Sequence, residues 1–229
     1  MRVLAIDCST AWLSVAAGDA TRCVERHELA GQSHSQLALP RIDAVLAEHA
    51  WQVSDLDAIA FGAGPGSFTG VRIACGVAQG LALGTSRPVV PVATLEALAQ
   101  QAFRMHAATR VCACLDARMR EVYIAAYERD GDRWREVQPP AVMKPDDVTL
   151  PRGDWFGAGE GFAAYPALAQ RLTLRAVDAT LTPSACAIIE LAVPRLIAGQ
   201  GVDAAHALPL YVRHRVALTS AERAAGMRL

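Results

Sequence analysis

The stretch that decides the fold reads Gly64-Pro65-Gly66-Ser67-Phe68-Thr69-Gly70, and it leads into Val71-Arg72-Ile73-Ala74-Cys75-Gly76-Val77-Ala78-Gln79-Gly80-Leu81-Ala82-Leu83-Gly84. The apolar run 56–61 before it is typical of a buried strand, and the residues after it favour a helix. A glycine-rich loop between a strand and a helix resembles a phosphate cradle, because amide groups at a helix start attract anions. The loop has no lysine and is not a Walker A sequence. Two interpretations stay open: a phosphate site with Arg72 as its nearby cation, or a tight turn before an interface helix.

Glycine recurs every four residues in the predicted helix 71–84, at Gly76, Gly80 and Gly84. Each glycine inside a helix costs roughly 0.5–1 kcal/mol relative to alanine, so the three together cost about 2 kcal/mol. Such spacing is useful where a second helix approaches the backbone closely. Contact with a partner chain and close packing inside this chain explain the spacing equally well.

Around this stretch the chain alternates strands and helices. The apolar pattern predicts strands at 3–6, 12–17, 23–29, 56–61, 89–92, 111–115, 121–128 and 134–137, and helices at 34–50, 71–84, 94–106 and 184–198. Pro40 either starts the first helix or lies inside it, and Thr94 is the predicted cap of the third. Residues 139–153 are rich in Pro and Asp and are predicted to form a loop.

The pattern of the opening residues returns in the second half of the chain. Ile6-Asp7-Cys8-Ser9 and Leu115-Asp116-Ala117-Arg118 both place an aspartate turn after a buried strand. This weak duplication predicts an α/β protein with two related lobes and mixed sheets flanked by helices. We expect an N-terminal lobe at 1–108 and a C-terminal lobe at 109–229, with the tail packing back on the N-terminal lobe.

The aspartate turn after the first strand is a second candidate for phosphate binding. Asp7 can hold a metal-bound phosphate through water, and the hydroxyl groups of Ser9 and Thr10 can bond phosphate oxygens. The alternative, which the residue chemistry favours, is that Asp7 and Thr10 stabilise the turn by accepting backbone hydrogen bonds. Together with the glycine loop, the candidate cofactor-binding residues are Asp7, Ser9, Thr10, Gly64, Gly66 and Ser67.

Composition argues against several classes of protein. A net charge of −1 disfavours autonomous nucleic-acid binding. The local excess of Arg213, Arg215, Arg223 and Arg228 is more typical of a solvated terminal helix than of part of an RNA surface. The six cysteines show neither a CxxC pair nor zinc spacing, so we expect all six to be reduced in a cytoplasmic protein. Asp7 interrupts the signal-like run at the N-terminus, and no stretch is long and apolar enough to span a membrane.

The sequence offers no complete set of catalytic residues. No two of the six histidines are spaced i, i+4, which excludes a helical two-histidine metal site, and we expect no bound metal. His34 is expected to help cap a helix start. Ser67 lies outside any GxSxG motif and has no identifiable base. Cys8 would need a histidine partner that the sequence does not place.

Several motifs in a fixed order carry a resemblance to a known family. They are Leu4-Ala5-Ile6-Asp7-Cys8-Ser9-Thr10, His34-Ser35, Leu39-Pro40-Arg41-Ile42-Asp43, 64–73, Thr94-Leu95-Glu96-Ala97-Leu98-Ala99, Asp116-Ala117-Arg118-Met119-Arg120-Glu121-Val122-Tyr123 and Pro209-Leu210-Tyr211-Val212-Arg213. Together they resemble the TsaB (YeaZ) family, bacterial partner proteins in the threonylcarbamoyladenosine modification of tRNA. The resemblance covers essentially the whole chain. Cys8 departs from the family, which commonly has Thr or Ser there, and this weakens the case for phosphate contacts by the turn.

The resemblance implies an actin-like fold of the sugar kinase and Hsp70 type, related to ribonuclease H. It implies a non-catalytic activating subunit that binds TsaD, the catalytic relative that carries an HxxxH metal pair, together with the ATPase TsaE. TsaD would contact helices 34–50 and 71–84, and a homodimer would use the same surface when TsaD is absent. The implied interface residues are His34, Leu37, Pro40, Arg41, Val45, Arg72, Cys75, Gly76, Gln79, Gly80 and Leu83.

The resemblance also bears on ligands and on competing functions. We expect contact with tRNA only through the complex and no contact with membranes. The residues establish no cofactor, and the resemblance allows ATP or ADP with Mg²⁺ at a complex interface. The alternative function is a stand-alone enzyme, either an actin-like ATPase or a glycoprotease-like peptidase.

Overall fold

The computed structural model describes residues 1–19 and 21–213 of the 229-residue chain. Its strands are β1 (Val3–Asp7), β2 (Trp12–Gly18), β3 (Cys23–Leu29), β4 (Ala58–Gly64), β5 (Val89–Ala93), β6 (Arg110–Asp116), β7 (Val122–Asp130), β8 (Arg133–Met143), β9 (Phe156–Ala158) and β10 (Ala176–Asp178). Its α-helices are α1 (His34–Glu48), α2 (Phe68–Thr85), α3 (Thr94–His106), α4 (Gly161–Ala164), α5 (Pro166–Arg171) and α6 (Ala185–Ile197). Short 3₁₀ turns η1, η2 and η3 lie at Val53–Asp55, Pro145–Asp147 and Ala204–His206.

The described strands form two sheets with the same internal order. The first runs β3-β2-β1-β4-β5, and the second runs β8-β7-β6-β9-β10 when read in the same sense. In the first sheet β1 pairs antiparallel with β2 and parallel with β4, and in the second sheet β6 pairs antiparallel with β7 and parallel with β9. The duplication predicted from the two aspartate turns is therefore confirmed, and the two mixed sheets with flanking helices make an α/β, actin-like fold.

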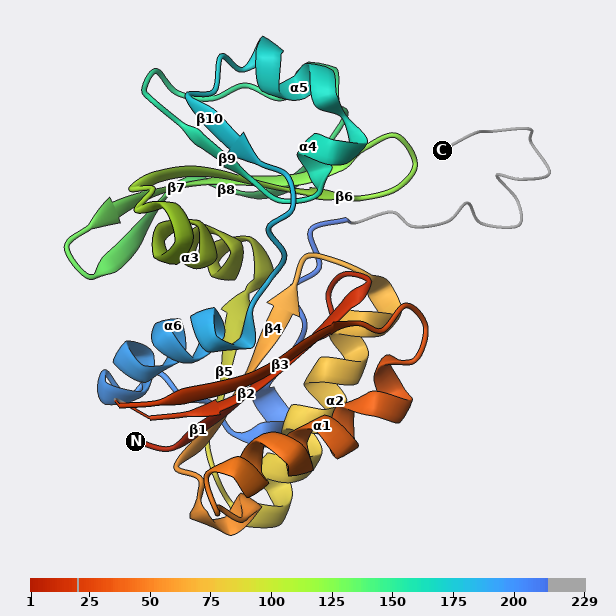
Figure 1. The fold of residues 1–229 in the computed structure, drawn as a ribbon. Helices are drawn as coiled ribbons and strands as arrows, with labels where there is room; N and C mark the ends of the chain where they lie inside the picture. The colour runs from red at the N-terminus through yellow and green to blue at the C-terminus, as the bar shows by residue number, and fades with distance from the viewer. Residues whose placement is uncertain (20, 214–229) are drawn as a thin grey trace.

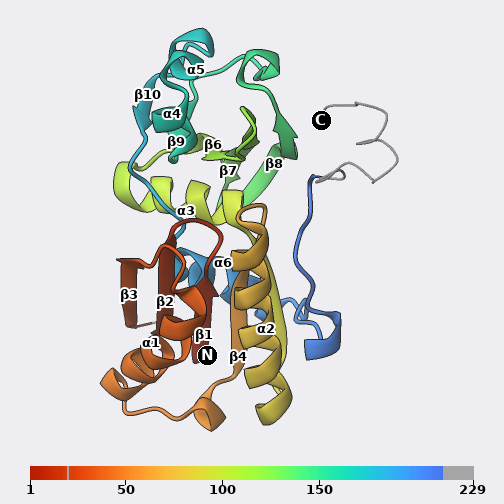
Figure 2. The ribbon, with the colours of Figure 1, turned by 90° about the vertical axis from the view of Figure 1, so that its right-hand side faces the viewer.

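The helices and sheets alternate in layers (Figures 1 and 2). Helices α1 and α2 cover one face of the first sheet, and α6 covers the other. Helix α3 packs on the second sheet, whose far face is covered by α4 and α5. Helices α3 and α6, the last helix of each half of the chain, thus lie between the two sheets. Helix α6 belongs to the C-terminal half of the chain but packs on the N-terminal sheet. The predicted boundary at residue 108 falls between α3 and β6.

The two predicted helix caps are wrong. Helix α3 is capped by Ala93, and the Thr94 side chain instead accepts a hydrogen bond of 3.1 Å from the amide of Gly64. Helix α1 begins after Ser33, while a ring nitrogen of His34 lies 3.3 Å from the carbonyl oxygen of Trp12. Both side chains are buried, so they bond groups of neighbouring elements instead of their own helix. Pro40, which the sequence left in either of two places, lies inside α1.

The predicted loop 139–153 is wrong in its first part, because β8 continues to Met143. Pro139 and Pro140 are tolerated for two reasons. Strand β8 lies at the edge of its sheet, and its register against β7 shifts between the pairs Ala126–Gln138 and Ile124–Ala141. Proline cannot donate to a neighbouring strand, and edges and bulges are the places where no such donation is needed.

The expectation that all six cysteines are reduced is also wrong. Cys23 on β3 and Cys186 on α6 form a disulfide across 163 residues of sequence. The fold brings them together because α6 lies on the N-terminal sheet, a placement that cysteine spacing does not reveal. Cys8, Cys75, Cys112 and Cys114 are buried free thiols.

The last described residues run back along the N-terminal half. The amide of Leu210 donates to the carbonyl oxygen of Ala63 at 2.7 Å, and Val202 forms a bridge with Val89. We call residues 201–213 the C-terminal strap. The expectation that the arginines at 215, 223 and 228 form a terminal helix or an RNA surface lies outside the described residues. Within the described residues, no helix is both long and apolar enough to cross a membrane.

Candidate functional site

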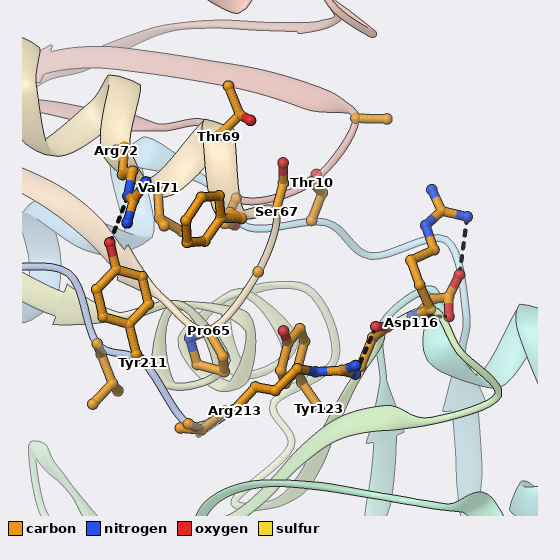
Figure 3. Close-up of a pocket in the computed structure, with 18 of the residues that line it drawn as sticks. Thr10, Pro65, Ser67, Thr69, Val71, Arg72, Asp116, Tyr123, Tyr211 and Arg213 are labelled. Atoms are coloured by element: carbon orange, nitrogen blue, oxygen red, sulfur yellow. Dashed lines mark hydrogen bonds and ion pairs between the residues drawn. The ribbon is translucent and has the colours of Figure 1, made fainter. Parts of the chain in front are cut away.

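A cavity of about 910 Å³ opens between the two lobes (Figure 3). One wall is the aspartate turn and the glycine loop of the N-terminal lobe, and the other is the corresponding turn of the C-terminal lobe. The C-terminal strap contributes Tyr211 and Arg213. A cavity of this size is sufficient for a small organic ligand, so the chemistry of its walls decides what it can hold.

The two predicted phosphate loops are bonded to each other. The amide of Ser67 donates to the carbonyl oxygen of Ser9 at 2.7 Å. A Cβ added to Gly66 would lie 2.4 Å from that same oxygen, and one added to Gly70 would lie 1.8 Å from the carbonyl oxygen of Cys8. These glycines are therefore required by the close approach of the two loops. The contact occupies the Ser67 amide, which a phosphate would need as a donor, and fills the space beside Gly66 and Gly70.

The side chains of the loops are engaged locally as well. Ser67 Oγ accepts from the amide of Gly70 and so caps α2, and Thr10 Oγ1 accepts from the amide of Trp12. Asp7 Oδ1 accepts from the amide and the hydroxyl of Ser9 at 2.9 and 2.7 Å. The aspartate turn thus forms in the way its residue chemistry favours, by hydrogen bonds to its own backbone.

Asp7 is 1% exposed and does not line the cavity. Burial raises the pKa of its carboxyl group, and the hydrogen bonds from Ser9 offset part of this effect. Asp7 Oδ2 has no hydrogen-bond partner among the described residues, and a Cβ added to Gly62 would lie 1.8 Å from it. An aspartate in this position is poorly placed to hold a metal-bound phosphate in the cavity.

The structure therefore divides the six predicted cofactor-binding residues. Ser9, Thr10, Gly66 and Ser67 line the cavity, whereas Asp7 and Gly64 lie behind it. Gly64 has a positive φ of 109°, and its amide donates a hydrogen bond to the hydroxyl of Thr94, the first residue of α3.

The C-terminal wall carries two carboxyl groups beside Arg118, and the sequence motifs did not mark it as a site. Asp116 and Glu160 both line the cavity. Burial and the nearby Asp116 raise the pKa of Glu160, while Arg118, which pairs with Asp116 at 3.2 Å, lowers it. The repeat of the aspartate turn was the signal for Asp116, but nothing in the sequence brought Glu160 beside it.

Aromatic and cationic side chains form the rim of the cavity (Figure 3). The Arg72 guanidinium lies 3.6 Å from the centroid of the Phe68 ring, and its Nε donates to the Tyr211 hydroxyl at 2.8 Å. Arg213 donates to the carbonyl oxygen of Ala117 at 2.9 Å and pairs with Glu121 at 2.8 Å. Arg72, the cation beside the glycine loop, is thus held by Phe68 and Tyr211. The C-terminal strap forms hydrogen bonds with both lobes.

A second candidate surface is the outer face of α1 and α2. A Cβ added to Gly76, Gly80 or Gly84 would meet no atom of the described residues within 4 Å. Packing inside the described chain therefore does not account for these glycines. Leu83 beside them is 77% exposed, and Leu39 on α1 is 53% exposed. The face combines open glycine backbone with exposed apolar side chains.

The structure sorts the predicted interface residues into two groups. Those with access to solvent on the two helices are Leu37, Pro40, Arg41, Arg72, Gly76, Gln79, Gly80 and Leu83. His34, Val45 and Cys75 are buried within the chain. A 3.6-residue period turns every third or fourth residue of a helix away from solvent, and these three residues lie at such positions.

Three of the accessible residues are also held by this chain. Arg41 pairs with Glu28 on β3, which lowers the pKa of Glu28. Gln79 Nε2 donates to the carbonyl oxygen of Ala207 at 2.9 Å, and the Cys75 thiol donates to the same oxygen at 3.1 Å. Arg72 is held at the rim by Phe68 and Tyr211. The strap thus covers one flank of α2 and leaves the glycine face open.

Among the described residues, neither Cys8 nor Ser67 is placed as a nucleophile in the cavity. Burial raises the pKa of the Cys8 thiol far above its usual range, and the Asp7 charge adds to this effect. Ser67 serves as the cap of α2. Within residues 1–19 and 21–213, no group of three or more His, Cys, Asp or Glu side chains is arranged to hold a metal ion.

Comparisons with known proteins agree on one family. Residues 27–217 match the family model of TsaD, described as tRNA N6-adenosine threonylcarbamoyltransferase. The chain is 41% identical over 223 residues to the tRNA threonylcarbamoyladenosine biosynthesis protein TsaB of Escherichia coli K12, covering 95% of this chain and 96% of that protein. The TsaB of Haemophilus influenzae is 38% identical over 226 residues, with coverages of 94% and 95%. The structure of YeaZ from Pseudomonas aeruginosa superposes with a TM-score of 0.87 at 43% identity, covering 92% of this chain and 99% of that one.

Proposed function

The chain belongs to the TsaB (YeaZ) family, and from this premise we propose that it acts in the biosynthesis of threonylcarbamoyladenosine in tRNA. In this proposal it is a non-catalytic subunit of the cytoplasmic complex that transfers the threonylcarbamoyl group. It binds TsaD, holds it in an active conformation together with TsaE, and meets tRNA only through the complex.

The observation that carries the proposal is the open glycine backbone of α2. Glycine inside a helix costs roughly 0.5–1 kcal/mol per residue relative to alanine. Gly76, Gly80 and Gly84 carry this cost, although alanine at each position would meet no neighbour within the described residues. Close approach of a helix from another chain offsets the cost, because a Cβ would then collide with the partner backbone.

The side chains around the glycines support an interface of this kind. Leu83 and Leu39 are exposed, and Leu37, Ile73 and Val77 are half-buried between them and the core. Interfaces bury such apolar centres within a polar rim. TsaD, a relative of this chain, is the proposed partner, and in its absence a second copy of this chain occupies the same face.

The geometry of the cavity favours a subunit over a stand-alone ATPase or peptidase. The glycine loop is bonded to the aspartate turn, Asp7 is buried, and Cys8 is a buried thiol. These contacts leave the glycine loop and the aspartate turn poorly suited to hold a nucleotide phosphate. In our proposal ATP or ADP with Mg²⁺ is therefore held where the subunits of the complex meet, outside this loop.

Reconstitution tests the proposal. Purified TsaD, TsaE, substrates and unmodified tRNA are combined with or without this chain, and threonylcarbamoyladenosine is measured by mass spectrometry of digested tRNA. The proposal expects modification only when this chain is present. Equal modification without it would overturn the activating role. ATP hydrolysis by the isolated chain that is lost in Asp7→Ala would favour the stand-alone enzyme.

A further inference from the structure

The Cys23–Cys186 disulfide joins two distant parts of the fold. Cys23 begins β3, the edge strand of the N-terminal sheet, and Cys186 lies in the first turn of α6. Helix α6 follows β10, the edge strand of the C-terminal sheet. The bond therefore fastens the connection that leaves the C-terminal lobe to the far edge of the N-terminal sheet. Its Cα atoms are 6.2 Å apart.

Hydrogen bonds surround the disulfide and hold the same connection without it. Glu25 Oε1 accepts from the Ser184 hydroxyl at 2.8 Å and from the amide of Cys186 at 3.2 Å. The amide of Ala185 donates to the Ser14 hydroxyl at 2.8 Å. Because these bonds do not involve sulfur, reduction of the disulfide does not remove them. We therefore expect α6 to stay docked on the sheet, by a weaker attachment, when the disulfide is reduced.

The two cysteines differ in accessibility, and the pair differs from the other cysteines. Cys23 is exposed, whereas Cys186 is 4% exposed. Burial raises the pKa of the Cys112 thiol to about 12 and raises those of Cys8, Cys75 and Cys114. Thiolate is the reactive form of cysteine, so these four thiols are poor partners for exchange. Redox chemistry is directed to the one pair that has an accessible member.

We propose that Cys23 and Cys186 form a reversible thiol–disulfide switch, driven by exchange with a small-molecule disulfide such as oxidised glutathione, that fixes the first turn of α6 to β3. Its reversibility rests on the proposed cytoplasmic function, because disulfides of cytosolic proteins are usually transient or redox-sensing. Oxidation restrains the connection 179–184 between the lobes, and reduction releases that restraint.

Each step of the exchange balances. The Cys23 thiolate attacks one sulfur of oxidised glutathione, a protein–glutathione disulfide forms, the glutathione S–S bond breaks, and one glutathione thiolate leaves. The Cys186 thiolate then attacks the Cys23 sulfur, and the second glutathione thiolate leaves. Two protein thiols are oxidised, and one glutathione disulfide is reduced to two thiols. The exposed Cys23 takes the mixed disulfide, and the buried Cys186 resolves it.

The test uses the purified full chain in glutathione buffers of defined ratio, followed by differential alkylation and peptide mass spectrometry. We expect Cys23 and Cys186 to change state together while the other four cysteines stay alkylatable after denaturation. Cys186→Ser should accumulate a glutathionyl group on Cys23, whereas Cys23→Ser should acquire little on Cys186. Free thiols at both positions in oxidised buffer, or equal labelling of the two single variants, would overturn the proposal.

A second measurement tests the conformational effect. Amide hydrogen exchange in the first turn of α6 should be roughly tenfold or more faster in the reduced chain than in the oxidised chain. The double variant Cys23→Ser with Cys186→Ser is the control and should exchange at the reduced rate in both buffers. Equal rates in the two redox states of the wild type would refute a switch. Because neither measurement needs TsaD or tRNA, their failure leaves the proposed role in the complex untouched.

Discussion

The amide of Ser67 donates a hydrogen bond of 2.7 Å to the carbonyl oxygen of Ser9. This bond joins the glycine loop before α2 to the turn after β1, two segments that are nearly sixty residues apart. It explains why the loop has the shape of a phosphate cradle without the lysine of one. The glycines of the loop allow two backbones to touch, and the helix that follows carries the exposed surface.

The first prediction concerns the two kinds of glycine in this region. Gly66→Ala should lower the free energy of unfolding by about 1–3 kcal/mol, because its Cβ would lie 2.4 Å from the Ser9 carbonyl oxygen, which also accepts the hydrogen bond from the Ser67 amide. Gly76→Ala should raise it by about 0.5–1 kcal/mol, because the position is open and alanine favours a helix. Urea denaturation measures both, at a protein concentration low enough to keep the chain monomeric. Equal effects of the two substitutions would contradict the distinction between a tightly packed Gly66 and an open Gly76.

The second prediction concerns pH. Burial raises the pKa of Asp7 above its ordinary 3.8, so the folded state binds a proton more readily than the unfolded state does. The ionised carboxylate therefore lowers stability as pH rises from about 3.8 through the folded pKa, and this loss is absent below 3.8.

Asp7→Asn removes that titration. The difference in unfolding free energy between variant and wild type should shift in favour of the variant as pH rises through this window, whatever its value at low pH. Urea denaturation at a series of pH values measures the difference. A constant offset across the window would contradict the burial of an Asp7 oxygen that has no partner among the described residues.

The third prediction concerns the C-terminal strap. Gln79→Met keeps the volume of the side chain but removes the donor to the buried Ala207 carbonyl, leaving that oxygen with the weaker Cys75 thiol. The expected loss is about 1–2 kcal/mol, together with faster amide exchange in the strap. Gln36→Met on the exposed side of α1 is the matched control and should change neither quantity. Unchanged exchange in Gln79→Met would show that the strap is held by other contacts.

The fourth prediction concerns the disulfide. A bond that closes a loop of this length restricts the unfolded chain, so reduction should lower the free energy of unfolding by about 2–4 kcal/mol. Denaturation with and without reductant measures the change. The double serine variant should show no dependence on reductant. The same stability of oxidised and reduced wild type would mean that the hydrogen bonds of Glu25 alone set the attachment of α6.

Local sequence patterns predicted much of the fold correctly. The buried runs of β1 and β6, each followed by an aspartate, predicted the duplication, and the small residues after Gly70 predicted α2. Each of these signals is contained in a short stretch of sequence. What failed depended on contacts across the fold. Thr94 bonds Gly64 instead of its own helix, and β8 continues through Pro139 because it is an edge strand.

The candidate site shows the same division. The sequence identified both loops of the cavity, but their mutual hydrogen bond, the burial of Asp7 and the approach of Glu160 to Asp116 arise only when the lobes are assembled. A period of four residues also cannot tell an open glycine from a packed one. The exposure of Gly80 and the burial of Val45 were decided by which face of each helix meets the sheet.

Gly80→Leu places a large side chain in the middle of the open glycine face of α2, which we propose as the binding surface for TsaD. Gly80 is exposed and a Cβ there would meet no atom of the described residues within 4 Å, so the monomeric variant should fold with at least wild-type stability. Its affinity for TsaD, measured by isothermal titration calorimetry, should fall about a hundredfold or more, because a leucine would hold the two helices apart. Ala167→Leu on α5, an exposed position in the C-terminal lobe, is the control and should bind normally. Wild-type affinity in a well-folded Gly80→Leu protein would show that TsaD does not bind at this face.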